Sequence, residues 1–134
     1  MFKKITIFIF LFLLAFFVIY HLKKTATQKN PHKINYFLEN KNVTLLIADT
    51  PEKWERGLMF VKKLDDADGM IFIFPDKKIR TFWNKNTFVD LDIYWINGKN
   101  IIGKDFLPSI SKTGKITTVD SKKEVNKVIE IIKK

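Results

Sequence analysis

An alternating run near the middle of the chain places the strongest constraint on its fold. Its apolar residues have one strand parity and its polar residues the other: Val89, Leu91, Ile93 and Trp95 against Asp90, Asp92 and Tyr94. Because successive side chains of a strand point to opposite faces, the run predicts a half-buried β-strand. Asn97 and Gly98 follow it and predict a type I′ hairpin turn, in which both central residues have positive φ. The segment "NIIGKDFL" is then the returning strand.

Further strands and one helix are expected before this hairpin. The segment "NVTLLIA", residues 42–48, is rich in β-branched residues, and "MIFIFP", residues 70–75, is apolar throughout. The first predicts a strand, and the second a strand that is buried on both faces and ends at Pro75. Between them, Thr50 and Pro51 have the pattern of an N-cap followed by a first-turn proline, and Gly57 is a stop signal. One short helix is expected there.

The C-terminal segment is ambiguous. Ser121 and Glu124 match a capping box, and apolar residues follow at helical spacing: Val125, Val128, Ile129 and Ile132. The same segment, "KVIEII", would also serve as a strand, although its residues alone favour a helix. The turn "SKTGK" and the strand "ITTV" precede it. Many short strands with one helix predict a mainly β fold, either a sandwich or a barrel.

Composition limits the classes of function. The chain of 134 residues is long enough for one ordinary domain. Its net charge of +10 includes six lysines before residue 34, and the remaining 18 basic and 14 acidic residues are interspersed. No basic cluster is dense enough to follow a phosphate backbone, so no nucleic-acid partner is expected. The absence of cysteine excludes disulfides, thiolate catalysis and thiolate metal sites.

The N-terminal segment predicts an attachment to the membrane. Residues 5–22 are uncharged and mostly apolar, with a lysine pair on each side. A helix of this length spans about 27 Å, close to the thickness of a hydrocarbon core. A cleaved signal peptide is the alternative, but the small residues that cleavage requires are absent. We expect a signal anchor or transmembrane helix in residues 1–22, a polar tether in 23–33 and a β-rich domain in 34–134, outside the cytoplasm.

Few residues suggest catalysis. The two histidines, His21 and His32, lie outside the predicted domain and leave no catalytic triad or imidazole metal site, so no catalytic residue, metal or cofactor is expected. Asp90 and Asp92 project to one side of a strand with Cα atoms roughly 6.6 Å apart, a separation compatible with two-carboxylate chemistry. The alternative is that both are solvated side chains, or that one accepts hydrogen bonds from a turn.

Four blocks together resemble one family in order and spacing: "ERGLM", "GMIFIF", "FWNKNT" and "LDIYWING". The chain is similar to Domain of Unknown Function 192 over roughly residues 43–131. The resemblance implies a single compact, mainly β, jelly-roll-like domain, often exported, without an established activity. It also implies that "KVIEII" is a strand preceded by a capped turn at Ser121. The chain departs from the family pattern at Asn84, where methionine is usual, and at Asp90, where proline is usual.

The family pattern falls on residues that we expect to form a site at one rim of the domain: Arg56, Met59, Trp83, Lys85, Asn86, Thr87 and Asp92. As a binding site, its cations would hold an anionic or polyhydroxyl envelope ligand and Trp83 would provide a stacking wall. As scaffold, Asp92 would pair with Arg56 or Lys85 in a buried network. The leading expectation is a membrane-tethered, non-catalytic binding or structural module of the cell envelope. The alternative is an envelope hydrolase, perhaps acting on glycans, with Asp92 as acid or base.

Overall fold

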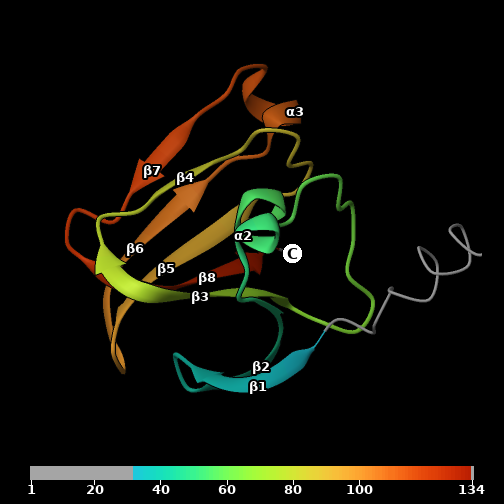
Figure 1. Ribbon diagram of the computed structural model, residues 1–134. Helices are drawn as coiled ribbons and strands as arrows, with labels where there is room; N and C mark the ends of the chain where they lie inside the picture. The colour runs from blue at the N-terminus through green and yellow to red at the C-terminus, as the bar shows by residue number, and fades with distance from the viewer. Residues whose placement is uncertain (1–31, 134) are drawn as a thin grey trace, which may run out of the picture. The chain divides into compact units, whose positions relative to one another are not determined.

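The computed structural model describes residues 32–133, and Lys33–Lys134 form one compact unit (Figure 1). The expected anchor in residues 1–22 and nearly all of the tether lie outside the described residues. Within residues 32–133, no helix is long and apolar enough to cross a membrane. Lys33, expected at the end of the tether, is already the first residue of a strand.

The domain is mainly β, as expected, with eight strands and two short helices. In chain order the strands are β1 (Lys33–Leu38), β2 (Lys41–Ala48), β3 (Gly69–Lys78), β4 (Thr81–Trp83), β5 (Leu91–Asn97), β6 (Asn100–Leu107), β7 (Thr118–Asp120) and β8 (Val125–Ile132). Six of them form one sheet in the order β1-β2-β3-β8-β5-β6, while β4 and β7 pair separately. The pair β2–β3 is parallel, and the other pairs are antiparallel.

Of the two expected architectures, a sandwich or a barrel, the closed barrel is wrong. The edge strands β1 and β6 do not pair with each other, so the large sheet stays open. One face of the sheet is covered instead by α2 (Pro51–Arg56), the turn after it and the small β4–β7 sheet (Figure 1). Trp54, Leu58 and Phe82 pack there with Phe72 and Trp95 of the sheet in what we call the first core cluster. The parallel β2–β3 pair, which α2 connects, also departs from an antiparallel jelly roll.

Strand β3 is longer than expected, because it does not end at Pro75 but continues to Lys78. Its apolar part is buried on both faces, as predicted. Its register with β8 shifts between Ile73, opposite Lys127, and Lys78, opposite Val125. Proline has no N–H to donate to the ladder, and strands accommodate it at such irregularities.

Strand β5 confirms the predicted parity but is more buried than expected. Leu91, Ile93 and Trp95 lie in the first core cluster. Tyr94 and Ile96, on the opposite face, lie in a second cluster with residues of β1, β2, β3 and β8. Because β5 pairs with β6 on one side and β8 on the other, it is an interior strand, and both of its faces are covered beyond Asp92.

The β5–β6 hairpin is confirmed, but its predicted turn is shifted by one residue. Asn97 pairs with Asn100, so the central residues are Gly98 and Lys99. Only Gly98 has positive φ, the pattern of a type II′ turn. The turn with positive φ at both central positions is Glu39–Asn40, between β1 and β2.

The C-terminal segment is strand β8, so the expectation from the resemblance is confirmed and the helical period was misleading. Its backbone pairs with both β3 and β5, and Val128 lies opposite Phe72 on one side and Trp95 on the other. Ser121 does not cap a helix, because its Oγ donates to the Lys123 carbonyl and accepts from Arg80 N. The predicted turn before β7 contains a second helix, α3 (Ile110–Thr113), which ends at Gly114.

Candidate functional site

The α2 helix is fixed at both ends and against the sheet. Thr50 Oγ1 accepts a hydrogen bond from Lys53 N at 3.4 Å, Pro51 opens the helix, and Gly57 ends it with φ of 47°. Trp54 Nε1 donates to the Ala48 carbonyl at 3.0 Å, which ties the helix to the end of β2. The predicted cap at Thr50, start at Pro51 and stop at Gly57 are confirmed. The helix places Arg56 at its exposed end.

The segment after β4 is held by Asn84, which is completely buried. Asn84 Nδ2 donates to Pro108 O at 2.9 Å and to Thr113 Oγ1 at 3.0 Å, while Oδ1 accepts from Thr117 N at 2.7 Å. One side chain therefore joins β4 to α3 and to the start of β7. Asn84, one of the two residues that depart from the family pattern, is a scaffold residue in this chain.

A groove lies between α2 and this segment, and we call it the α2–β4 groove. It has a volume of about 390 Å³ and is lined by Glu52, Glu55, Arg56, Met59, Phe60, Trp83, Lys85 and Asn86. Five of the seven predicted site residues meet here, from two segments far apart in sequence. Phe60 N donates to Asn86 O at 2.8 Å, and this hydrogen bond joins the two sides of the groove.

The cations of the groove have no anionic partner among residues 32–133. Neither Arg56 nor Lys85 forms an ion pair there, although Glu52 and Glu55 line the same groove. Lys85 Nζ lies 4.9 Å from the centre of the Trp83 ring, which is 42% exposed. Two cations beside an exposed indole form a surface suited to an anion that also has an apolar or sugar face.

Thr87 has a different position from its neighbours. It is buried, and its Oγ1 donates to the Lys85 carbonyl at 3.3 Å, as expected of a residue that satisfies a loop. Thr87 lines a smaller cavity of about 30 Å³ next to the groove, which we call the inner pocket. The inner pocket and the groove share Glu55, Arg56, Met59 and Trp83.

Sequence reasoning missed the titratable residue of the inner pocket, Glu130. Its side chain is in the middle of β8 and is 4% exposed, and its Oε2 accepts no hydrogen bond from any described residue. Burial raises the pKa of this carboxyl to about 8. A Cβ atom at residue 57 would lie 3.8 Å from Oε2, so glycine at this position leaves space in front of the carboxyl.

A signal for Glu130 was present in the sequence. A single acid interrupts the apolar run "VIEII", and in a strand it has the parity of Val128 and Ile132, which face the first core cluster. The prediction of a helix for this segment concealed the alternation that places Glu130 on the face of the core. Because β8 is a central strand, Glu130 lies opposite Met70 on one side and Ile93 on the other, and neither apolar side chain can hydrogen-bond to its carboxyl.

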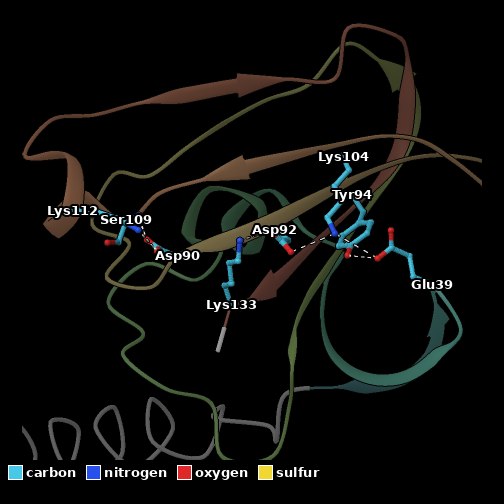
Figure 2. A network of polar contacts seen from close by, with 8 residues as sticks. All are labelled: Glu39, Asp90, Asp92, Tyr94, Lys104, Ser109, Lys112 and Lys133. Carbon is cyan, nitrogen blue, oxygen red and sulfur yellow. Dashed lines mark hydrogen bonds and ion pairs between the residues drawn. The ribbon is translucent and has the colours of Figure 1, made fainter.

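Asp92 does not join the other predicted site residues. It lies on the opposite face of β5 and lines a separate pocket of about 440 Å³. One of its oxygens lies 3.4 Å from Lys104 Nζ and the other 3.9 Å from Lys133 Nζ. Figure 2 shows Lys104 between Asp92 and Glu39, with the Tyr94 hydroxyl donating to Glu39 at 2.8 Å. The expected pairing of Asp92 with Arg56 or Lys85 is therefore wrong.

Asp90 has the structural role given above as the alternative to catalysis, because it accepts a hydrogen bond from a neighbouring turn. Its Oδ1 accepts from Ser109 N at 2.8 Å, and its Oδ2 lies 3.0 Å from Lys112 Nζ (Figure 2). The hydrogen bond from Ser109 N, helped by Lys112, lowers the pKa of Asp90 below its ordinary value. Asp90 and Asp92 thus have separate partners and do not share a site.

Comparison with known proteins agrees with this fold. A protein of Sinorhizobium meliloti 1021, described as a candidate transcription regulator, has a crystal structure that matches with a TM-score of 0.61 and 25% identity, over 75% of this chain and 76% of that chain. A protein of unknown function from Novosphingobium aromaticivorans DSM 12444 matches with a TM-score of 0.57 and 21% identity, over 78% of this chain and 83% of that one. No curated protein matches. The model of the family DUF192, described as uncharacterized ACR, matches residues 33–134, and the chain belongs to this family.

Proposed function

We propose that this protein is a membrane-tethered, non-catalytic binding module of the cell envelope, and that the α2–β4 groove is its ligand site. The observation that carries the proposal is the pair of cations, Arg56 and Lys85, that flank an exposed Trp83 without an ion pair among the described residues. A structural network would pair these charges. A binding site leaves them available for a ligand.

The groove supports a small ligand with negative charge or many hydroxyls. Its volume of about 390 Å³ is within the range of small-molecule sites. Arg56 and Lys85 supply donors for phosphate or carboxylate oxygens. Asn86 supplies neutral hydrogen bonds, and Trp83 offers an apolar face on which a sugar ring stacks. The groove therefore favours an anionic or polyhydroxyl envelope molecule.

Binding is tested with the full chain in a polyoxyethylene detergent, which is neither charged nor a sugar. We expect sn-glycerol 3-phosphate to change the tryptophan fluorescence, because Trp83 is in the groove. Arg56→Ala and Lys85→Ala should each weaken this binding about tenfold or more. Lys99→Ala, an exposed lysine in the β5–β6 turn, is the matched control. Equal loss in all three variants, or in none, would refute the assignment of the groove.

The location outside the cytoplasm is part of the proposal and has its own test. Because the chain contains no cysteine, a single cysteine introduced at Lys123 or Lys29 reports the location of the domain or the tether. Labelling of both by a membrane-impermeant maleimide on intact cells is expected. Protection of both positions until the cells are lysed would exclude an exported domain.

The alternative of an envelope hydrolase that uses Asp92 stays a prediction. Its test is turnover of envelope polymer by the full chain, with Asp92→Asn compared with Asp90→Asn. A turnover that only the first variant abolishes would replace the binding module with an enzyme. In that case the pocket of Asp92, Lys104 and Lys133 would be the site.

A further inference from the structure

The inner pocket contains a chemical group that the proposed binding of an anion leaves without a role. Glu130 is buried in the first core face of the sheet, next to apolar strand neighbours, and its Oε2 has no hydrogen-bond partner among the described residues. A buried polar atom without a partner is costly, and folded proteins contain few of them. Such an atom at the wall of a pocket marks a place for a ligand group.

We propose that the inner pocket receives a primary ammonium group of the ligand, which Glu130 binds as a carboxylate. The inference rests on the proposed function, because the α2–β4 groove, which shares four wall residues with the inner pocket, is the route by which a ligand reaches it. The ligand class thereby becomes narrower. It is a molecule with a primary amine next to an anionic or hydroxyl-rich part.

The size of the inner pocket selects this group. Its volume of about 30 Å³ has room for one or two groups of the size of water, since one water molecule needs about 10 to 15 Å³ of such a cavity. An ammonium head has the size of a water molecule, whereas a trimethylammonium or a guanidinium head contains four or more heavy atoms. The pocket therefore suits an ammonium group better than a quaternary amine or an arginine-like group.

The walls of the pocket combine aromatic rings with hydrogen-bond acceptors. Trp54, Phe72, Phe82 and Trp83 line it, and an aromatic ring attracts a cation that lies over its face. An ammonium group has three donors and no acceptor. Glu130 Oε2 takes one of them, and Thr87 Oγ1, which donates to the Lys85 carbonyl, keeps its lone pairs for a second.

The protonation state of Glu130 also agrees with an amine whose binding displaces the proton from the carboxyl. The charged residues that line it are Glu55 and Arg56 of α2 and Glu130 itself, whereas β3 and β4 contribute only Phe72, Phe82 and Trp83. Since the pKa of Glu130 is about 8, the carboxyl is about nine-tenths protonated at pH 7. Ionisation at pH 7 is only tenfold unfavourable, which one charge-assisted hydrogen bond offsets. Binding should release nearly one proton.

The test titrates the full chain, in polyoxyethylene detergent, with methylammonium and with tetramethylammonium at pH 7. Calorimetry is run in PIPES and in HEPES, whose different ionisation enthalpies report the protons released. We expect methylammonium to bind at least tenfold more tightly than tetramethylammonium, with release of most of one proton. Glu130→Gln, which keeps the size of the side chain, should lose at least tenfold in affinity and the proton release. Equal affinity for the two ions, or unchanged binding by Glu130→Gln, would overturn the inference.

The failure of this inference is distinguishable from the failure of the proposed function. Binding of sn-glycerol 3-phosphate without methylammonium leaves the groove as an anion site and refutes the ammonium site. Binding of methylammonium without sn-glycerol 3-phosphate supports the ammonium site in the inner pocket and refutes the anion site in the groove. Two further probes identify the source of the amine. Preference for vesicles that contain phosphatidylethanolamine over phosphatidylcholine indicates a lipid headgroup, whereas binding of free phosphoethanolamine without that preference indicates a soluble amine.

Discussion

Gly69 and Glu130 pack backbone against backbone so closely that a Cβ atom at residue 69 would lie 1.8 Å from the Glu130 carbonyl oxygen. Gly69 begins β3 and pairs with Ile131, the residue after Glu130. Only glycine permits this approach of the two strands. The contact fixes the position of the strand that contains the buried carboxyl of the inner pocket.

Gly69→Ala is therefore expected to destabilise the domain by about 3 kcal/mol or more, because the new methyl group meets backbone that cannot move without breaking the β3–β8 ladder. The free energy of unfolding is measured by urea denaturation. Gly103→Ala is the matched control, since its Cβ would approach only the Trp95 side chain, at 3.1 Å. A loss from Gly69→Ala no larger than that from Gly103→Ala would contradict the close packing.

Glu130 predicts that stability falls as pH rises. The pKa of its carboxyl is raised to about 8 in the folded chain, so between about pH 4.5 and pH 8 the folded state binds a proton that the unfolded state has lost. The contribution of Glu130 to the free energy of unfolding is fully present below about pH 4.5 and is lost by about pH 8. The decrease is on the order of 3 kcal/mol between pH 5 and pH 7.5.

Thermal unfolding of Glu130→Gln, compared with the original chain across this pH range, isolates the effect of Glu130. The original chain should lose some 10 °C in Tm relative to the variant between pH 5 and pH 7.5. Parallel curves for the two proteins would show that Glu130 does not titrate in this range.

Arg56→Ala and Lys85→Ala should leave stability nearly unchanged. Both side chains are exposed and form no ion pair with a described residue, so each change is expected to be within about 0.5 kcal/mol. Thermal melts of the variants check this against the losses of ligand affinity proposed above. A decrease of 10 °C or more in both would assign the groove cations to the scaffold.

Asn84→Ala should destabilise the domain by about 2 to 4 kcal/mol. The change removes four hydrogen bonds, to Pro108, Thr113, Lys115 and Thr117, and leaves part-buried backbone groups without partners. Asn86→Gly is the control two residues away, because glycine keeps the positive φ of Asn86. Urea denaturation should separate the two variants, and equal effects would mean that Asn84 is not the residue that holds α3.

Tyr94→Phe should cost about 1 kcal/mol, because it removes the hydrogen bond from the Tyr94 hydroxyl to Glu39 and leaves the ring in the second core cluster. Tyr36→Phe is the matched control, since Tyr36 packs against the same cluster without a side-chain hydrogen bond among the described residues. The difference between the two free energies of unfolding measures the hydrogen bond. A difference near zero would indicate that solvent replaces it.

The candidate site was only partly predictable. The resemblance to a family identified Arg56, Met59, Trp83, Lys85 and Asn86, and the structure brings these five together in the α2–β4 groove. It also grouped Asp92 with them, which the structure does not support. Whether two segments meet depends on the pairing of distant strands, and no short pattern in either segment contains that information.

The sequence by itself determined the features that depend on neighbouring residues. These are the cap and stop of α2, the parity of β5, the presence of a glycine turn after it, although not its register, and the strand β2. Each follows from backbone geometry and side-chain direction over a few residues. Tertiary structure decided what depends on distant residues. These features are the continuation of β3 past Pro75, the burial of both faces of β5, and the strand conformation of β8, whose own residues favoured a helix. It also decided the place of Glu130, because a carboxyl is buried or exposed only according to the strands that pack beside it.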